Sequence, residues 1–209
     1  MGEYWELKFK TEGAMWDFIP ADSAIRTLQI FKSNNLKEIL IPGFGYGRNG
    51  KLFIENDFNV TGIEISKSAI DIARNNNINC TIYHGSVTDM PFDNKTYDGI
   101  YCYALIHVLN KKERQIFLNS CFNQLNNNGL MILTVASARN SMFGMGKKLG
   151  KNRFKISTGL NVFFYDSLSI IKEFSPYGLI EYEEIEEPVK FMTDQPPVNL
   201  ISVTCKKQF

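Results

Sequence analysis

The chain has little of what marks metal sites or disulfide frameworks. Its 209 residues include two histidines and four scattered cysteines, at Cys80, Cys102, Cys121 and Cys205. No two cysteines form a C-x-x-C pair, and no histidine pair lies near them. Zinc sites and redox motifs depend on such close spacings. We therefore expect no metal centre and four reduced thiols.

Signals for secretion or membrane insertion are also missing. The amino terminus has no basic region followed by an apolar one, because Glu3, Glu6 and Lys8 interrupt it. No apolar run approaches the roughly 20 residues of a membrane span. Unpaired cysteines are typical of a reducing compartment. We expect a cytoplasmic protein with no membrane partner.

Neither basic nor acidic residues are in clear excess. The chain has 23 basic and 22 acidic side chains, a formal net charge of +1. A polyanionic partner such as nucleic acid is therefore not indicated by overall charge. The length fits one domain, 1–209, which we divide into an amino-terminal part (1–35), a central half (36–136) and a last third (137–209).

What the chain does have is a glycine-rich turn after a short apolar run. Residues 39–50 read Ile-Leu-Ile-Pro-Gly-Phe-Gly-Tyr-Gly-Arg-Asn-Gly, and an apolar segment compatible with a helix follows. This is the pattern of a strand, a tight turn and a helix start, where a ligand can approach the backbone closely. The glycines fit both G-x-G-x-x-G (dinucleotides) and G-x-G-x-G (S-adenosylmethionine, SAM). A plain tight turn fits equally well.

Strand and helix patterns alternate along the rest of the chain. Strands are predicted at 37–42, 60–65, 80–83, 97–102, 130–135, 179–185 and 199–206, and helices from Asp22, Asn49, Ser66, Lys111 and Asp166. The first helix would bury Ala24, Ile25, Leu28 and Phe31, and the last Leu168, Ile171 and Phe174. Such alternation predicts an α/β fold: a doubly wound, Rossmann-like, mainly parallel seven-stranded sheet with an antiparallel C-terminal strand and helices on both faces.

Candidate ligand-binding residues follow the ends of the predicted strands. They are Gly43–Gly47, Glu64, the Ser86–Asp89 loop and Tyr103. Ligands of such sheets bind at the carboxyl ends of the strands. Glu64, 17 residues beyond Gly47, suits hydrogen bonds to two ribose hydroxyls, the alternative being a solvated surface carboxylate. We expect one cleft to collect these residues.

In order, these pieces resemble the class I SAM-dependent methyltransferases over residues 39–135. Residues 39–47 resemble the family's first motif, 62–66 its strand-two acid motif and 85–92 its G-D-x-x-x-L-P-F loop. Residues 97–109 resemble F-D-x-V … L-x-H-L, and 125–130 stand where L-K-P-G-G is common. The resemblance implies a methyltransferase with SAM as cofactor.

The resemblance also implies roles for individual residues. Gly43, Phe44, Gly45 and Gly47 would lie along the methionine and ribose, and Glu64 would bind the ribose hydroxyls. Around the adenine it places Ile65, Ser86 and Val87, with Asp89 at the exocyclic amine. Tyr103 would line the methionine side.

Two departures from the family pattern stand out. Ile41 replaces the acid that often contacts the methionine amino group, and Ser86 replaces an acid in the adenine loop. Pro42-Gly43 instead resembles the P-G-x-G variant of the thiopurine, thiol and tellurite-type branch, whose amino-terminal tryptophans approach the site. Trp5 and Trp16 are candidates for a lid over the ligand, the alternative being that they cover the sheet edge. The similarity to this branch makes Trp16 the candidate cover over the cofactor.

Methyl transfer requires no dedicated base, since positioning the acceptor supplies much of the acceleration. Tyr103 and His107 are the candidates, with a packing role as the alternative for His107. No Asn/Asp-Pro-Pro-Tyr/Phe motif is present, which disfavours a nucleic-acid adenine as acceptor and leaves a small molecule. The rival interpretations are an NAD(P)-dependent oxidoreductase using the same turn and a SAM-binding module without turnover.

Acceptor specificity is expected in the last third of the chain. Residues 136–164 contain six basic residues, no acid and four glycines. This suits a pliant cover that meets an anionic acceptor or, as a weaker alternative, an RNA backbone; a solvated basic loop is the other interpretation. Phe191 and Met192 are further candidates for the acceptor pocket. We expect a monomer or weak dimer.

Overall fold

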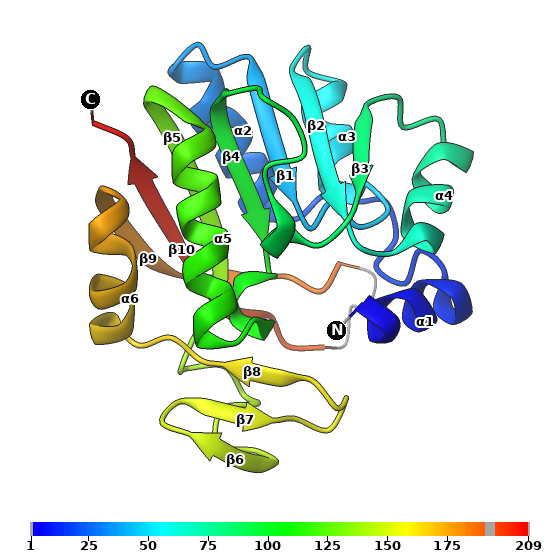
Figure 1. Cartoon of the computed structure of the whole chain (residues 1–209). Helices are drawn as coiled ribbons and strands as arrows, with labels where there is room; N and C mark the ends of the chain where they lie inside the picture. The colour runs from blue at the N-terminus through cyan, green and yellow to red at the C-terminus, as the bar shows by residue number, and fades with distance from the viewer. Residues whose placement is uncertain (1, 191–194, 209) are drawn as a thin grey trace.

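The computed structural model describes residues 2–190 and 195–208. A seven-stranded sheet of order β3-β2-β1-β4-β5-β10-β9 forms its centre (Figure 1). The strands are β1 (Glu38–Pro42), β2 (Asn59–Glu64), β3 (Thr81–His84), β4 (Tyr97–Tyr103), β5 (Leu125–Ala136), β9 (Leu179–Glu187) and β10 (Val198–Lys206). Phe191 and Met192 lie outside the described residues.

The direction of each strand confirms the predicted sheet. β1 pairs in parallel with β2 and β4, β2 with β3, and β4 with β5. β10 runs antiparallel to both of its neighbours, β5 and β9. Parallel neighbours need crossover connections, and the helices between the strands supply them. The carboxyl ends of β1 to β5 therefore meet at one edge of the sheet.

Helices cover both faces, as predicted. They are α1 (Gly2–Glu12), α2 (Asp22–Ser33), α3 (Arg48–Ile54), α4 (Lys67–Asn75), α5 (Lys111–Gln124) and α6 (Ser167–Phe174). The core of one face contains side chains of α2, α3 and α4, and the core of the other contains those of α5 and α6. In β1, Ile39 and Ile41 belong to the first core and Leu40 to the second. A strand covered on both faces has to be apolar at every position.

The predicted apolar faces of two helices were partly wrong. In α2, Ala24, Leu28 and Phe31 are buried, but Ile25 is exposed. In α6, Phe174 is buried with Ile170, whereas Leu168 and Ile171 are exposed. In each helix, fewer apolar side chains face the sheet than the sequence offers. The predicted buried face of the helix was therefore rotated by about one residue from the observed one.

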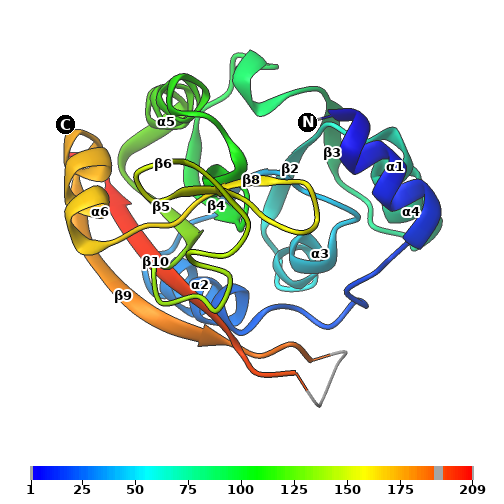
Figure 2. The same ribbon diagram turned by 90° about the horizontal axis from the view of Figure 1, so that it is seen from below.

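Two further elements were not predicted. Residues 2–12 form helix α1, which packs on α4 (Figure 1). The glycine-containing basic segment is not an irregular loop: it carries a small antiparallel sheet of β6 (Lys147–Gly150), β7 (Arg153–Lys155) and β8 (Asn161–Phe163). This lobe lies below the carboxyl edge of the main sheet, in front of β4 and β5 (Figure 2). Of the helices described here, none is both long and apolar enough to cross a bilayer.

Candidate functional site

A cavity of about 380 Å³ lies at the carboxyl edge of the main sheet. Its wall collects residues from the turn after β1, the end of β2, the loop after β3 and the end of β4. The amino-terminal residues and the end of β9 contribute the rest. Of the predicted site residues, nine line it: Trp16, Gly43, Phe44, Gly45, Glu64, Ile65, Ser86, Val87 and Tyr103.

The glycine turn brings bare backbone to this cavity. The amides of Gly43 and Phe44 both donate to the Ile63 carbonyl at 2.9 Å, which fastens the turn to β2. Gly45 has a φ of +60°, which favours glycine. A Cβ added there would approach no atom more closely than the Phe9 ring, at 4.0 Å. The open side of Gly45 therefore admits a ligand against the main chain.

Glu64 places a buried carboxylate beside this turn. It is 5% exposed, and it accepts hydrogen bonds from the Gly45 amide at 2.7 Å and the Ser66 amide at 2.8 Å. Burial raises its pKa, although the two amides oppose the shift. Each carboxylate oxygen keeps a further lone pair, so the group can accept hydrogen bonds from two hydroxyls of a ligand.

The loop after β3 forms the next part of the wall. The Gly85 amide donates to the Glu64 carbonyl at 2.9 Å, and the Ser86 hydroxyl accepts from the Thr88 amide at 3.2 Å. Val87 is buried and starts a short 3₁₀ turn, Val87–Asp89. Thr88 lines the cavity, but Asp89 is exposed and does not.

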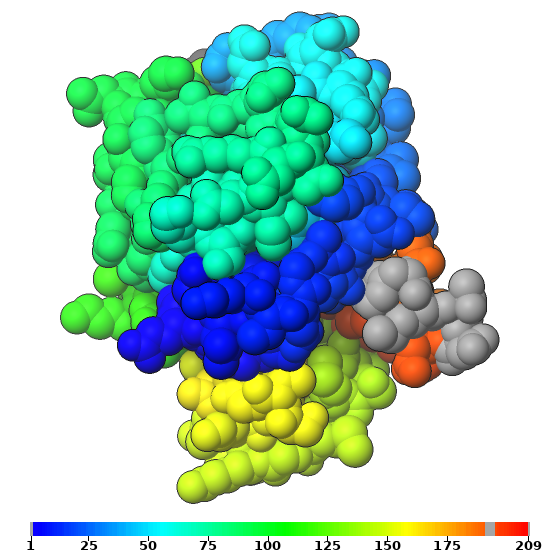
Figure 3. Space-filling model, turned by 90° about the vertical axis from the view of Figure 1, so that its right-hand side faces the viewer, coloured from blue at the N-terminus to red at the C-terminus, as the bar shows by residue number. Residues whose placement is uncertain are grey.

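Aromatic residues of the amino-terminal part close one side of the cavity. Trp5 and Phe9 of α1 line it together with Trp16 and Tyr46. The Trp16 and Tyr46 rings are stacked, with centroids 6.4 Å apart, and the Tyr46 hydroxyl accepts from the Trp16 amide at 3.0 Å. In Figure 3, α1 (dark blue) lies between the main body and the lobe. Trp5 was a candidate for a lid over the ligand together with Trp16, whereas Phe9 was missed because helix α1 was not predicted.

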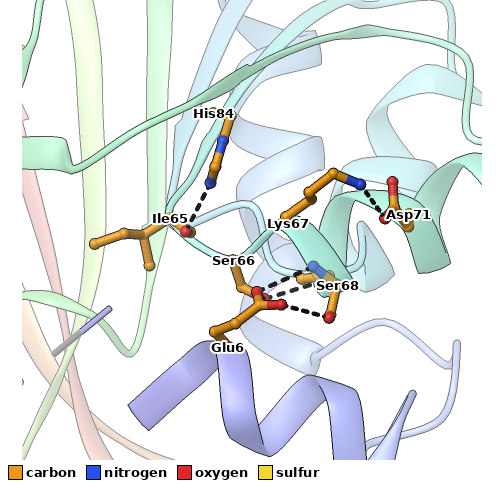
Figure 4. Close-up of polar contacts among 8 residues, drawn as sticks. Glu6, Ile65, Ser66, Lys67, Ser68, Asp71 and His84 are labelled. Atoms are coloured by element: carbon orange, nitrogen blue, oxygen red, sulfur yellow. Dashed lines mark hydrogen bonds and ion pairs between the residues drawn. The ribbon is translucent and has the colours of Figure 1, made fainter. Parts of the chain in front are cut away.

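A single carboxylate holds α1 in this position (Figure 4). Glu6 accepts hydrogen bonds from the Ser66 hydroxyl at 2.8 Å, the Ser68 hydroxyl at 2.7 Å and the Ser68 amide at 3.1 Å. The bonds from Ser68 and Ser66 lower the pKa of Glu6 to about 2. Since Ser66 caps α4 and lies two residues after Glu64, the last residue of β2, α1 is tied to the segment that forms the cavity wall.

The two candidate bases have different surroundings. Tyr103 lines the cavity, and burial with the nearby Glu187 charge raises its pKa to about 12. His107 is not among the lining residues, its Nδ1 accepts from the Ala136 amide at 3.2 Å, and burial lowers its pKa to about 4. Neither of these two side chains is a strong proton acceptor at neutral pH, so neither predicted candidate is a ready base.

Gly47, a predicted site residue, is not among the residues that line the cavity. It has a φ of +82°, and an added Cβ would stand 2.7 Å from Ile78 and 2.8 Å from the Phe44 ring. The Phe44 side chain points into the core, 5% exposed. These two residues therefore shape the turn through packing. Phe44 is part of the cavity wall through its place in the turn, while its ring lies in the core.

Three charged residues that line the cavity were not predicted from the sequence: Arg48, Glu113 and Glu187. Arg48 follows the last glycine of the turn, and its guanidinium lies 5.3 Å from the Tyr103 ring centroid. Glu187 ends β9 and accepts from the Asp22 and Ser23 amides, at 2.6 and 3.2 Å. The position of Arg48 beside the glycines was a usable signal, whereas nothing local in the sequence marks Glu187.

The basic segment does not contribute to the wall. None of residues 136–164 lines the cavity, so an anionic acceptor inside it would meet no cation of the lobe. All four cysteines are free. Within residues 2–190 and 195–208, no cluster of three or more His, Cys, Asp or Glu side chains could hold a metal ion.

Comparison with known proteins fits this geometry. Residues 39–129 match the family model described as "Methyltransferase domain", which covers the glycine turn, Glu64, the loop after β3 and β4. No curated protein matches the sequence. The match covers less than half of the chain, from β1 to the start of β5.

Solved structures show the same fold at low identity. A SAM-dependent methyltransferase from Methanosarcina mazei has a TM-score of 0.72 at 15% identity, over 86% of this chain and 97% of its own. One from Clostridium acetobutylicum has 0.71 at 11%, over 89% and 91%. The Burkholderia thailandensis 1,6-didemethyltoxoflavin-N1-methyltransferase, solved with its acceptor and S-adenosylhomocysteine, has 0.73 at 12%, over 100% and 87%.

Proposed function

We propose that this chain transfers a methyl group from SAM to a small-molecule acceptor bound in the cavity. The main evidence for this proposal is the buried Glu64 carboxylate, which lies beside the open backbone of Gly45. Ser86 and Val87, from the next strand end, line the same cavity. Three segments far apart in the sequence thus offer a hydroxyl-binding carboxylate, bare backbone and an apolar wall to one ligand.

Each segment has a role in this proposal. Glu64 binds the two ribose hydroxyls, Gly43 and Gly45 lie along the ribose and methionine, and Ile65 with Val87 flanks the adenine. When bound, SAM supplies a methyl group on a sulfonium, which is transferred by in-line displacement. Trp16 covers this region as part of the amino-terminal aromatic side. Thr88 is the nearer polar group for the adenine edge, because Asp89 points to solvent.

The acceptor side is largely apolar. Leu105, Val108 and Leu109 line it next to Tyr103. A small acceptor packed against these groups would be held and shielded from water, and holding reactants near attack distance is a large part of the barrier reduction. A Tyr103 phenol that stays protonated at neutral pH can donate a hydrogen bond to the acceptor but does not remove its proton.

The methyltransferase match favours methyl transfer over the hydride chemistry of the oxidoreductase alternative. Calorimetric titration with S-adenosylhomocysteine (SAH) and with NADH separates them, and we expect SAH alone to bind. Tight NADH binding without SAH binding would refute the proposal. Labelled SAM with thiols, amines, phenols and metalloid anions then tests turnover; SAH binding with no methyl transfer to any of these would favour a non-catalytic module.

Several finer assignments belong to the same proposal. The Pro42-Gly43 variant and the Trp16 cover support the thiopurine, thiol and tellurite-type branch. Free cysteines support a reducing, cytoplasmic setting. We also infer a single functional domain over 1–209 that works as a monomer or weak dimer, which light scattering would test.

A further inference from the structure

Part of the cavity wall lies beyond the segments that are proposed to bind SAM. Those segments lie at the carboxyl ends of β3, β2, β1 and β4, which are neighbours in the sheet order β3-β2-β1-β4-β5-β10-β9. The wall continues with the end of β9 and the start of β10, at residues 187–189 and Val198. Since the cofactor segments do not reach β9 and β10, this part of the cavity is the place for the acceptor.

Glu187 brings to this place a buried charge that no basic side chain offsets. Its carboxylate is 3% exposed and lines the cavity. It forms no ion pair with a described residue, and the nearby Lys190 pairs with Asp22 instead. A carboxylate removed from water without a cation is costly. A positively charged ligand group would offset that cost.

Capping of helix α2 accounts for only part of this arrangement. Ala21 precedes α2 and cannot cap it with its side chain, so the two oxygens of Glu187 accept from the Asp22 and Ser23 amides in its place. An uncharged side-chain oxygen can satisfy such an amide as well. Each carboxylate oxygen also keeps a further lone pair. The negative charge and the free lone pairs are therefore available to a ligand.

The surroundings of Glu187 suit a cationic acceptor better than an anionic one. Burial and the Glu187 charge raise the pKa of Tyr103 to about 12, so the phenol stays protonated and its oxygen can accept a hydrogen bond from an ammonium group. Glu113 of α5 is another carboxylate on the wall, whereas the six basic residues of 136–164 lie off it. Arg48, the one basic residue among the described lining residues, lies over the Tyr103 ring.

We propose that the acceptor is an amine and that Glu187 binds its positively charged nitrogen. This inference rests on the proposed function. The resemblance to the thiol and tellurite-type branch concerns the turn and the tryptophan cover, not the acceptor. A thiolate or a metalloid anion would be repelled by Glu187, which disfavours both as acceptors.

The charge balance of the reaction fits this position of Glu187. The amine arrives as an ammonium and releases one proton to water. Its nitrogen lone pair then forms the bond to the methyl carbon of SAM, while the C–S bond breaks and its electron pair goes to sulfur. The products are a neutral thioether and a methylated ammonium. Positive charge thus passes from sulfur to nitrogen, and a fixed carboxylate beside the nitrogen stabilises it.

The test uses two stable analogues of SAM that reach into the acceptor end. Both have nitrogen in place of the sulfur and an ethyl or propyl arm in place of the methyl group; the arm ends in an ammonium group in one and in a hydroxyl in the other. In calorimetric titration, wild type should prefer the ammonium arm by roughly 10-fold or more, the range of hydrogen bonds to charged groups. Glu187→Gln should lose most of that preference by weakening the ammonium analogue alone. Glu187→Asp keeps the charge and should retain part of it.

Glu186→Gln is the matched control, because Glu186 is the preceding residue of β9, is exposed and does not line the cavity. It should change neither affinity, and melting temperatures verify that the variants fold. With labelled SAM, wild type should methylate small primary amines rather than the matching alcohols and thiols, a result that does not depend on any variant.

Three results would overturn the inference while SAH still binds. Equal weakening of both analogues by Glu187→Gln would show that Glu187 only caps α2. A wild type without preference for the ammonium arm would exclude cation binding at this end of the cavity. Methylation of thiols or alcohols but of no amine would exclude the acceptor class. Failure of wild type to bind SAH would instead refute the proposed function itself.

Discussion

Replacing Glu64 by glutamine tests whether this carboxylate is kept for a ligand or for the fold. The side chain keeps its size, and one oxygen can still accept from the Gly45 or Ser66 amide. The other amide would face an NH₂ group instead of an oxygen. The substitution therefore removes the charge and one acceptor from a group that is only 5% exposed.

The two possible roles predict opposite effects on stability and binding. Losing the charged hydrogen bonds to the ribose should weaken SAH binding by about 1 to 3 kcal/mol, a factor of roughly 5 to 150. Burial raises the pKa of Glu64 in the folded chain, so ionising it at neutral pH costs stability. That cost disappears as the pH falls below the ordinary range of a glutamate. Without ligand, Glu64→Gln should therefore melt at or above the wild-type temperature.

The measurement combines calorimetric titration with SAH and thermal melting of the free protein at pH 7. In wild type, affinity for SAH should also decrease with acidification as Glu64 becomes protonated, and the variant should lack that component. A variant that binds SAH normally but melts well below wild type would show that Glu64 serves the turn alone. The ribose assignment would then have to be withdrawn.

Three other substitutions test the packing of the site. Gly62→Ala places a Cβ 2.6 Å from the Phe44 ring and should lower the free energy of unfolding, measured by chemical denaturation, by roughly 1 to 3 kcal/mol. Adding Phe44→Leu should recover part of that loss. If the effects of the two substitutions on stability simply add, the contact is not responsible. Glu6→Gln should speed amide exchange over residues 2–12; wild type should show the same loosening as the pH falls from about 4.5 toward 2, because the pKa of Glu6 is lowered in the folded state. His107→Gln should leave SAH affinity unchanged. The lowered His107 pKa makes wild-type stability fall as the pH drops from 6.5 toward 4, and a variant with the same acid profile would show that another group is responsible.

The central half of the fold could be predicted because its information is local. Residues 39–41 are apolar in sequence, which already places β1 between two layers. Ser66 and Asp166 cap α4 and α6 in the structure as the sequence indicated. The boundaries moved by a few residues, most of all for β5, which begins at Leu125 rather than 130.

The amino-terminal cover could not be predicted because its helix depends on a distant contact. Residues 2–12 bury only one side chain, Phe9, so their sequence has no clear apolar face. Their position depends on Glu6 reaching serines 60 and 62 residues further along the chain. The small sheet of β6, β7 and β8 was not predicted for a related reason. All residues of β6 are exposed, so its sequence does not alternate between buried and exposed positions. Glu187 reaches the cavity from 165 residues beyond Asp22, a proximity that only the closed sheet creates.

The glycine spacing did not distinguish the possible cofactors because two of its four glycines, Gly47 and Gly50, are required by packing against Phe44 rather than by a ligand. A Cβ at Gly47, Gly50 or Gly62 would stand within 2.8 Å of the Phe44 ring. Among the glycines of the turn, Gly45 alone has open space where a Cβ would stand, and it lines the cavity. In this structure the Phe44 ring occupies the space of a Cβ at each of these three positions, so these glycines do not report on the ligand. We therefore expect the choice of ligand to depend on the carboxylate at the end of β2 and on the charge that follows the turn, and these are the groups to substitute first.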